Sequence, residues 1–222
     1  MARPDNEVSP CAFYMLGIIH RDRRNDELLG KWIDALTPEV ITLELSPYGL
    51  AFRQAMGKAY RRRIDDIVRS LEGEGHPCLS GEVEDLYAYV DVPREFTIAD
   101  EYCRRSGARL YPVDMDLFSW MKLREIDELI NRTNVEKSVA FRVREGRGAE
   151  NVLASLYFRS GVSAFSYTDE MALRDGFMCR GIGALTKRFS GKRFLHIGGW
   201  RHLTDPLGFY ARFQPVKIFP YD

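Results

Sequence analysis

This sequence has no excess of charge of either sign and no long apolar run. Its 32 lysine and arginine residues balance 32 aspartate and glutamate residues, which argues against a general nucleic-acid binder, since such proteins are basic. No stretch approaches the roughly 20 apolar residues that a membrane helix needs. The first ten residues are polar and lack the apolar core of a signal peptide. We therefore expect a cytoplasmic protein without a membrane segment.

Common motifs of hydrolases and nucleotide-binding proteins are also missing. The sequence contains no P-loop, no Gly-x-Ser-x-Gly elbow and no His-Glu-x-x-His zinc helix. The four cysteines include no Cys-x-x-Cys pair, and we interpret them as reduced, small core residues. The missing Gly-x-Ser-x-Gly elbow removes the usual serine hydrolase from consideration.

Strand-like and helix-like segments alternate along the chain. Apolar runs predict strands at residues 11–19, 40–45, 109–113, 192–197 and 216–219. Helical patterns lie between them, with Asn25 and Thr168 as predicted N-caps and two or three helices predicted within residues 118–161. This alternation predicts an α/β fold with a mainly parallel central sheet covered by helices. We expect one domain over residues 1–222, with a helical insertion in the second half, at about residues 116–190.

Two of the four histidines follow predicted strands, each three residues after a glycine. The first motif is Gly17-Ile18-Ile19-His20, and the second is Gly199-Trp200-Arg201-His202. In open α/β sheets the ligand crevice lies outside the carboxyl ends of the strands, so both histidines are expected at one site. The alternative, which stays open here, is that each histidine only bonds a loop carbonyl.

Glu44 lies near the end of the second apolar strand. A buried carboxylate is costly unless it is paired, hydrogen-bonded or bound to a metal, so Glu44 is expected to share the site with His20. The alternative is that the strand has already reached the surface and Glu44 is solvated or caps the following turn.

Arg174 lies within an apolar helical stripe that includes Met171, Met178 and Ile182. A cation in such a stripe needs an acidic partner or an anionic ligand. The alternative is an arginine that snorkels from the edge of the stripe to solvent.

Three further residues have strong structural explanations. Glu95 begins a predicted helix after Pro93, where a carboxylate suits the helix dipole. Asp114 ends the third strand and points toward the crevice, but we favour it as the N-cap of the next helix. His196 lies inside the fourth strand and is interpreted as a core residue.

Four segments, taken in order, resemble the TraB/PrgY–Tiki family, which belongs to a wider group with erythromycin-esterase-like and ChaN-like proteins. They are residues 17–20, 37–45, 174–178 and 199–202, and a fainter match covers residues 93–114. The chain departs from the family pattern at Met115, where arginine is usual, and at the bulky pair Trp200-Arg201.

The resemblance implies a metal-dependent hydrolase of the metallopeptidase kind. His20, His202 and Glu44 would be ligands of a divalent ion, with Mn, Co, Fe and Zn all compatible with imidazole and carboxylate donors. Glu44 or Glu95 would act as the general base, and Arg174 would neutralise a carboxylate or stabilise an oxyanion. The substrate would be a peptide or another small ester or amide.

The resemblance also leaves two other functions open. PrgY-like members act in peptide-pheromone control and ChaN-like relatives bind haem, so a non-catalytic protein could hold a peptide, an anion or haem in the same crevice. The last alternative is a decayed site on an interaction scaffold. The sequence predicts no oligomeric state.

Overall fold

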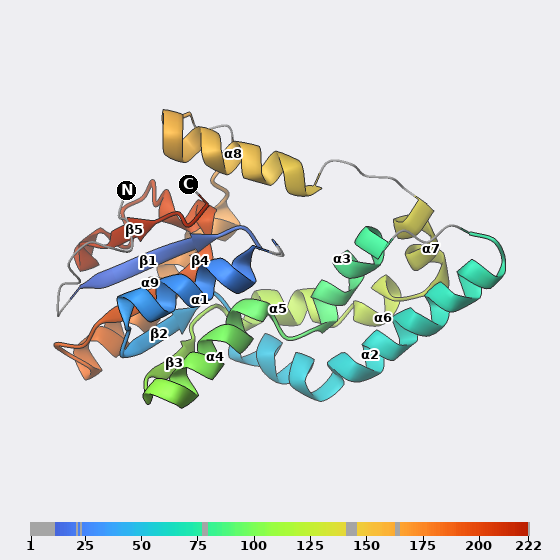
Figure 1. Cartoon of the computed structure of the whole chain (residues 1–222), viewed down its shortest axis with the longest axis horizontal. Helices are drawn as coiled ribbons and strands as arrows, with labels where there is room; N and C mark the ends of the chain where they lie inside the picture. Colours follow the sequence, from blue (N-terminus) through green and yellow to red (C-terminus); the bar gives the residue numbers. More distant parts are fainter. Residues whose placement is uncertain are drawn as a thin grey trace. The chain divides into compact units, whose positions relative to one another are not determined.

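A computed structural model describes residues 12–20, 22, 24–76, 80–140, 146–162 and 165–221. Its centre is a five-stranded sheet with the order β3-β2-β4-β1-β5, in which all neighbouring strands are parallel (Figure 1). The strands are β1 (Phe13–Ile18), β2 (Val40–Leu43), β3 (Arg109–Pro112), β4 (Phe194–Gly199) and β5 (Val216–Ile218). The predicted α/β class, the parallel sheet and its five strands are confirmed.

The chain divides into two compact units. The sheet unit comprises residues 1–45, 94–115 and 146–222, and the helical unit comprises residues 46–93 and 116–145, in each case as far as the structure describes them. All five candidate site residues belong to the sheet unit: His20, Glu44, Glu95, Arg174 and His202.

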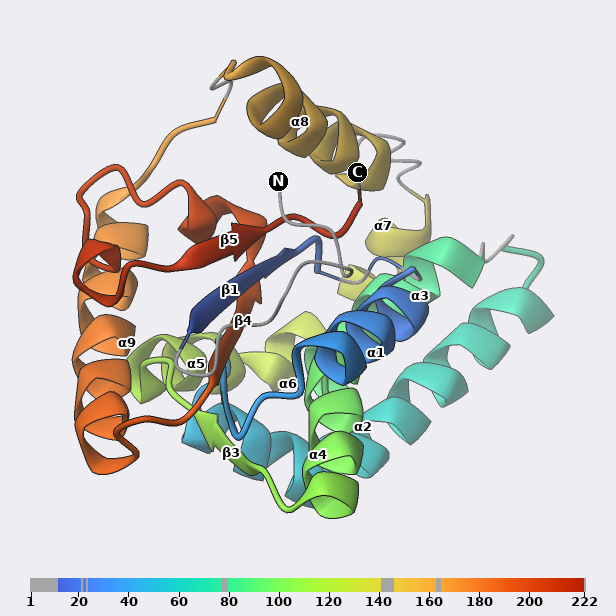
Figure 2. The ribbon, with the colours of Figure 1, turned by 60° about the vertical axis from the view of Figure 1, so that its left-hand side comes forward.

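Helices cover both faces of the sheet. α1 (Asn25–Leu36) and α4 (Arg94–Ser106) lie on one face, and α9 (Asp169–Arg188) lies on the other (Figure 2). The α9 face is held by apolar packing, because Met178 and Ile182 of α9 join Phe13, Met15 and Phe194 of the strands in one buried cluster. Strands buried on both faces explain why β1, β2 and β4 are largely apolar, with Thr42 and His196 as their buried polar residues.

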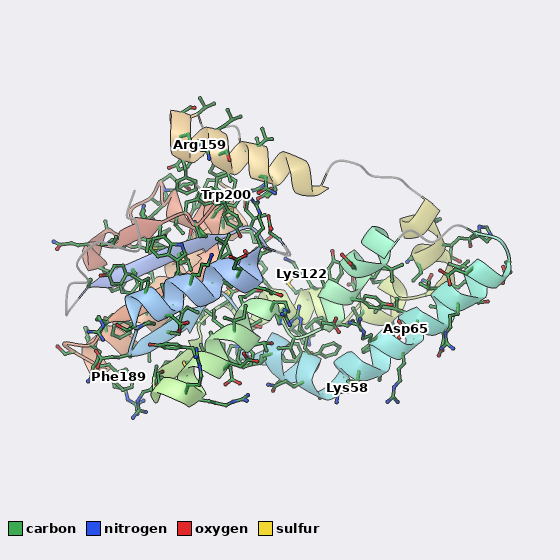
Figure 3. The ribbon with its side chains drawn as sticks, viewed as in Figure 1. Lys58, Asp65, Lys122, Arg159, Phe189 and Trp200 are labelled. Carbon is green, nitrogen blue, oxygen red and sulfur yellow. The ribbon has the colours of Figure 1, made fainter. Side chains whose placement is uncertain are left out.

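α8 (Gly146–Ser160) packs on a second cluster of the sheet unit. Its Ala154 is buried with Ile19, Trp200 and Phe219, and Figure 3 shows Trp200 on the side of the sheet that faces α8. Trp200 begins η1 (Trp200–Leu203), a short 3-10 helix after β4, and a second one, η2 (Ala211–Phe213), precedes β5.

The helical unit gathers two separate segments of the chain. It contains α2 (Pro47–Gly73), α3 (Ser80–Val90), α5 (Asp116–Leu123), α6 (Ile126–Leu129) and α7 (Arg132–Ala140). Together with α8 of the sheet unit, α5, α6 and α7 make four helices in the described part of the stretch 118–161, where the sequence predicted two or three. One reason is Asn131, whose amide donates to the Glu128 carbonyl at 2.6 Å and accepts from the Asn134 backbone at 2.8 Å. It closes α6 and starts α7.

One predicted helix cap is confirmed and one is wrong. The Thr168 hydroxyl accepts from the Met171 backbone at 3.3 Å and caps α9. Asn25 instead is the first residue of α1, and its amide donates to the Ile19 carbonyl at 2.9 Å. Its side chain is used to hold the turn before the helix, so it does not cap the helix itself.

Two smaller predictions concern cysteines and membranes. Cys103 and Cys179 are buried and free, as predicted, whereas Cys11 and Cys78 lie outside the described residues. Within the described ranges, no helix combines the length and the apolar character that crossing a membrane requires.

Candidate functional site

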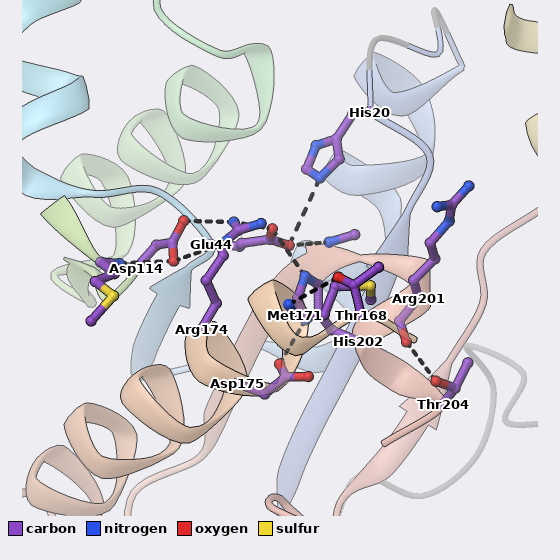
Figure 4. Close-up of polar contacts among 12 residues, drawn as sticks. His20, Glu44, Asp114, Thr168, Met171, Arg174, Asp175, Arg201, His202 and Thr204 are labelled. Carbon is purple, nitrogen blue, oxygen red and sulfur yellow. Dashed lines mark hydrogen bonds and ion pairs between the residues drawn. The ribbon is translucent and has the colours of Figure 1, made fainter. Parts of the chain in front are cut away.

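His20, Glu44 and His202 meet at the carboxyl ends of three adjacent strands (Figure 4). His20 follows β1, Glu44 follows β2 directly, and His202 lies in η1 after β4. Because the strand order places β4 between β1 and β2, residues far apart in the chain arrive at one edge of the sheet.

Glu44 lies at the centre of this cluster. Its Oε1 accepts from Arg174 at 2.6 Å and lies 3.1 Å from Nε2 of His202. Its Oε2 accepts from the Gly199 backbone at 2.6 Å and lies 3.8 Å from Nε2 of His20. Burial alone would raise the pKa of Glu44, but the cationic neighbours hold it well below its usual range. Glu44 is therefore a buried carboxylate whose charged form is stabilised by its neighbours.

His202 is fixed from both sides of its ring. Its Nδ1 lies 2.6 Å from Oδ1 of Asp175, while Nε2 faces Glu44. Desolvation would lower the pKa of His202, but Glu44 and Asp175 raise it to about 10. Only 5% of the side chain is exposed.

Asp175 is a site residue that the sequence analysis did not single out. It is fully buried and accepts from the hydroxyls of Tyr167 at 2.5 Å and Tyr210 at 2.9 Å as well as contacting His202. Three neighbours hold one carboxylate, so Asp175 is fixed in place. The signal for it in the sequence was the resemblance of residues 174–178 to the family's Arg-Asp/Asn-x-x-Met helix, from which no role was predicted for Asp175 itself.

His20 has the same kind of contacts as His202 but is more exposed to solvent. Its Nδ1 lies 3.2 Å from Oε1 of Glu95, at the start of α4, and its Nε2 points toward Glu44. Desolvation lowers the pKa of His20, but the contacts with Glu44 and Glu95 outweigh it and raise the pKa to about 10. The side chain is 47% exposed and that of Glu95 is 18% exposed, so solvent reaches the cluster from this side.

Arg174 binds two carboxylates. It donates to Glu44 and also makes a two-pronged contact with Asp114, from Nε to Oδ1 at 3.1 Å and from Nη2 to Oδ2 at 2.6 Å. The acidic partner predicted for Arg174 is therefore present. Asp114, which we favoured as a helix cap, is instead the second partner of this guanidinium. Desolvation opposes the charge, but Glu44 and Asp114 raise the pKa of Arg174 further.

The glycines of the two Gly-x-x-His motifs provide space. A Cβ atom at Gly17 would lie 2.7 Å from Cδ2 of Leu203, so glycine lets η1 pack against β1. A Cβ atom at Gly199 would lie 2.9 Å from Nε2 of His20. Real Cβ contacts are longer than this, so each glycine allows one histidine segment to approach the other.

His196 lies beneath the cluster and is buried, in keeping with its interpretation as a core residue. Its Nδ1 lies 3.0 Å from the Thr42 hydroxyl, and its ring stacks on Tyr210 at 5.7 Å. Desolvation lowers the pKa of His196 to about 4, so this imidazole is neutral.

The described residues contain no group of three or more His, Cys, Asp and Glu side chains already arranged to hold a metal ion. Instead, the Nε2 atoms of His20 and His202 both point at the Glu44 carboxylate. These two imidazole nitrogens and the carboxylate are the donors that suit Mn, Co, Fe or Zn.

Comparisons with protein-family models, with curated proteins and with solved structures found no match to this chain. The resemblance to the TraB/PrgY–Tiki family therefore stays a prediction that rests on the four ordered segments.

Proposed function

We propose that this chain is a metal-dependent hydrolase of the metallopeptidase kind, as the resemblance to the TraB/PrgY–Tiki family implies. His20, His202 and Glu44 would hold one divalent ion. The substrate would be a peptide or another small ester or amide.

One observation carries the proposal: two carboxylate–imidazole pairs converge on one carboxylate. Asp175 holds Nδ1 of His202 and Glu95 holds Nδ1 of His20, and each ring turns its Nε2 toward Glu44. Histidines that bind metals almost always donate their other ring N–H to a carboxylate, a carbonyl or water, which fixes the ring and raises its basicity. Two such carboxylate–imidazole pairs face the same carboxylate, that of Glu44.

The charge of the cluster also fits a divalent ion. The four carboxylates and the guanidinium are Glu44, Glu95, Asp114, Asp175 and Arg174. With both imidazoles protonated, the four carboxylates, the guanidinium and the two imidazolium rings sum to one negative charge. Replacing the two imidazolium protons by one divalent ion leaves that sum unchanged. Metal binding that releases protons from its ligands is the general case.

A divalent ion bound here would supply Lewis acidity, which polarises a carbonyl and lowers the pKa of a water molecule. The protein's own groups have separate tasks. Each oxygen of Glu44 already accepts a hydrogen bond of 2.6 Å, so Glu44 is a poor base and is better suited to bind the ion. Glu95 is more exposed and is assigned as the group that takes up a proton and returns it to the leaving group. Arg174 donates to both Glu44 and Asp114 and so holds the Glu44 carboxylate in place.

The test is metal content, measured by plasma mass spectrometry on protein purified without a chelator or a histidine tag. We expect near-stoichiometric divalent metal in the wild type and its loss in His20→Ala and in His202→Ala. His76→Ala is the matched control, because His76 belongs to the helical unit and lies 3.9 Å from Glu136 there. No metal in the wild type, even after incubation with Mn²⁺, Co²⁺ and Zn²⁺, would contradict the proposal.

A screen of peptide cleavage with the loaded protein then separates catalysis from binding. Cleavage that is lost in Glu95→Gln while the metal is retained supports the assigned base. Metal binding without turnover of any peptide, ester or amide would favour the non-catalytic alternative, in which the same crevice binds a ligand.

A further inference from the structure

α8 touches both of the segments that carry the histidines, through two consecutive residues. Glu150 contacts η1, the segment of His202: its Oε1 accepts from Nε1 of Trp200 at 2.6 Å, and its Oε2 accepts from Nη2 of Arg201 at 2.8 Å. The two bonded residues directly precede His202. One carboxylate of α8 thus binds both residues between Gly199 and His202.

Asn151 contacts the other segment. Its Oδ1 accepts from Arg24, and its Nδ2 lies 3.4 Å from Oδ2 of Asp22. Asp22 is two residues after His20, and its backbone N–H donates to the Ile19 carbonyl at 3.2 Å, so it closes the turn on which His20 lies. Arg24 and Asp22 also form an ion pair of 2.7 Å.

The contacts of Glu150 and Asn151 lie beside closely packed aromatic side chains, which hold α8 in place. The Trp200 ring, which is 1% exposed, meets Phe165 edge-on at a centroid distance of 4.9 Å. Phe158 of α8 stacks on Phe219 at 4.3 Å. α8 is therefore anchored by aromatic packing, and its polar pair is directed at the two turns.

From these contacts we infer that Glu150 and Asn151 are positioning residues: Glu150 sets the position of the His202 ring through Trp200 and Arg201, and Asn151 sets that of the His20 ring through Asp22 and Arg24. Neither residue touches Glu44 or belongs to the donor set. The inference rests on the proposed function only for the purpose of this positioning, which is to bind a metal ion.

The test observes the imidazoles directly, by ¹H–¹⁵N correlation spectra of the histidine rings. The sequence has only four histidines, so single substitutions assign every signal. We expect Glu150→Gln to shift the ring signals of His202 and Asn151→Ala to shift those of His20, with His76 unmoved in both.

The matched control is Phe158→Leu, which weakens the packing of α8 and leaves both polar contacts in place. It should lower the melting temperature and leave the signals of His20 and His202 where they are. Unchanged His202 signals in Glu150→Gln, unchanged His20 signals in Asn151→Ala, or equal shifts in Phe158→Leu would each overturn the inference. If Glu150→Gln does not fold, Arg201→Met removes the same ion pair from the other side and is judged by the same outcomes.

Co²⁺ titration of the same variants separates this inference from the proposed function. Groups that orient metal-binding histidines are worth roughly 10–100-fold in metal affinity, and we expect about tenfold weaker Co²⁺ binding in Glu150→Gln. A wild type that binds no Co²⁺ would reject the metal site, while the ring spectra would still decide whether Glu150 and Asn151 position the histidines.

Discussion

His20 and His202 each face a carboxylate through Nδ1 and Glu44 through Nε2, but the two pairs differ in burial. His202 is 5% exposed and has a fully buried partner in Asp175, whereas His20 is 47% exposed and pairs with Glu95, which is 18% exposed. The Nε2 of His202 is 3.1 Å from Glu44, and that of His20 is 3.8 Å away. The His202–Asp175 pair is therefore closed off from solvent, and the His20–Glu95 pair lies on the side of the site that solvent reaches. In the proposed hydrolase, a substrate would enter from the His20 side, next to Glu95.

The largest expected effect is on the buried pair. Asp175→Ala leaves His202 and two tyrosine hydroxyls without their common partner, and removing one member of a buried ion pair typically costs about 3–5 kcal/mol. Glu95→Ala breaks the exposed counterpart, for which about 0–1 kcal/mol is expected. Chemical denaturation of both variants measures the difference. Equal losses would show that the two pairs do not differ as described.

Substitutions of the two motif glycines, Gly17 and Gly199, also compare the buried and the exposed histidine. In Gly17→Ala the new methyl group would meet the Leu203 side chain at 2.7 Å, and overpacking of this kind costs about 1–3 kcal/mol of unfolding free energy. In Gly199→Ala it would meet Nε2 of His20 at 2.9 Å, but this half-exposed ring can move aside.

We therefore expect Gly199→Ala to keep most of its stability and to lose metal affinity. Denaturation and Co²⁺ titration of both glycine variants make the comparison. A Gly199→Ala protein that binds Co²⁺ as well as the wild type would contradict the close approach of His20 to β4.

A smaller effect is expected from pH in the metal-free protein. The pKa of His202 is about 10 when folded, against an ordinary value of 6.5, so between these values the folded protein binds a proton that the unfolded chain releases. This stabilisation is complete below pH 6.5 and is lost as the pH rises toward 10. The free energy of unfolding should fall over this range in chelator-treated wild type and fall less in His202→Asn. The same slope in both proteins would assign the loss to other groups.

Much of this arrangement follows from local sequence patterns. Apolar runs that end in His20 and Glu44 place these residues at strand ends, and parallel strands deliver their ends to one edge of a sheet. Arg174 in an apolar stripe predicts an acidic partner. These inferences need only the period of the pattern and the chemistry of burial.

Other features depend on distant segments, so local patterns do not contain them. Asp175 lies in the matched segment 174–178, but its role is recognisable only once α9 faces η1, because its partners Tyr167, His202 and Tyr210 come from three places in the chain. The cap predicted at Asn25 failed for a similar reason: Tyr221, near the far end of the chain, binds its side chain.

We propose that His20, His202 and Glu44 hold one metal ion. Anomalous X-ray diffraction from crystals soaked in Zn²⁺ or Co²⁺ tests it most directly. We predict one strong peak at roughly 2.0–2.2 Å, the usual zinc–ligand distance, from Nε2 of both histidines and from an oxygen of Glu44. No peak at this edge of the sheet, or a peak bound by only one of the two histidines, would contradict the claim.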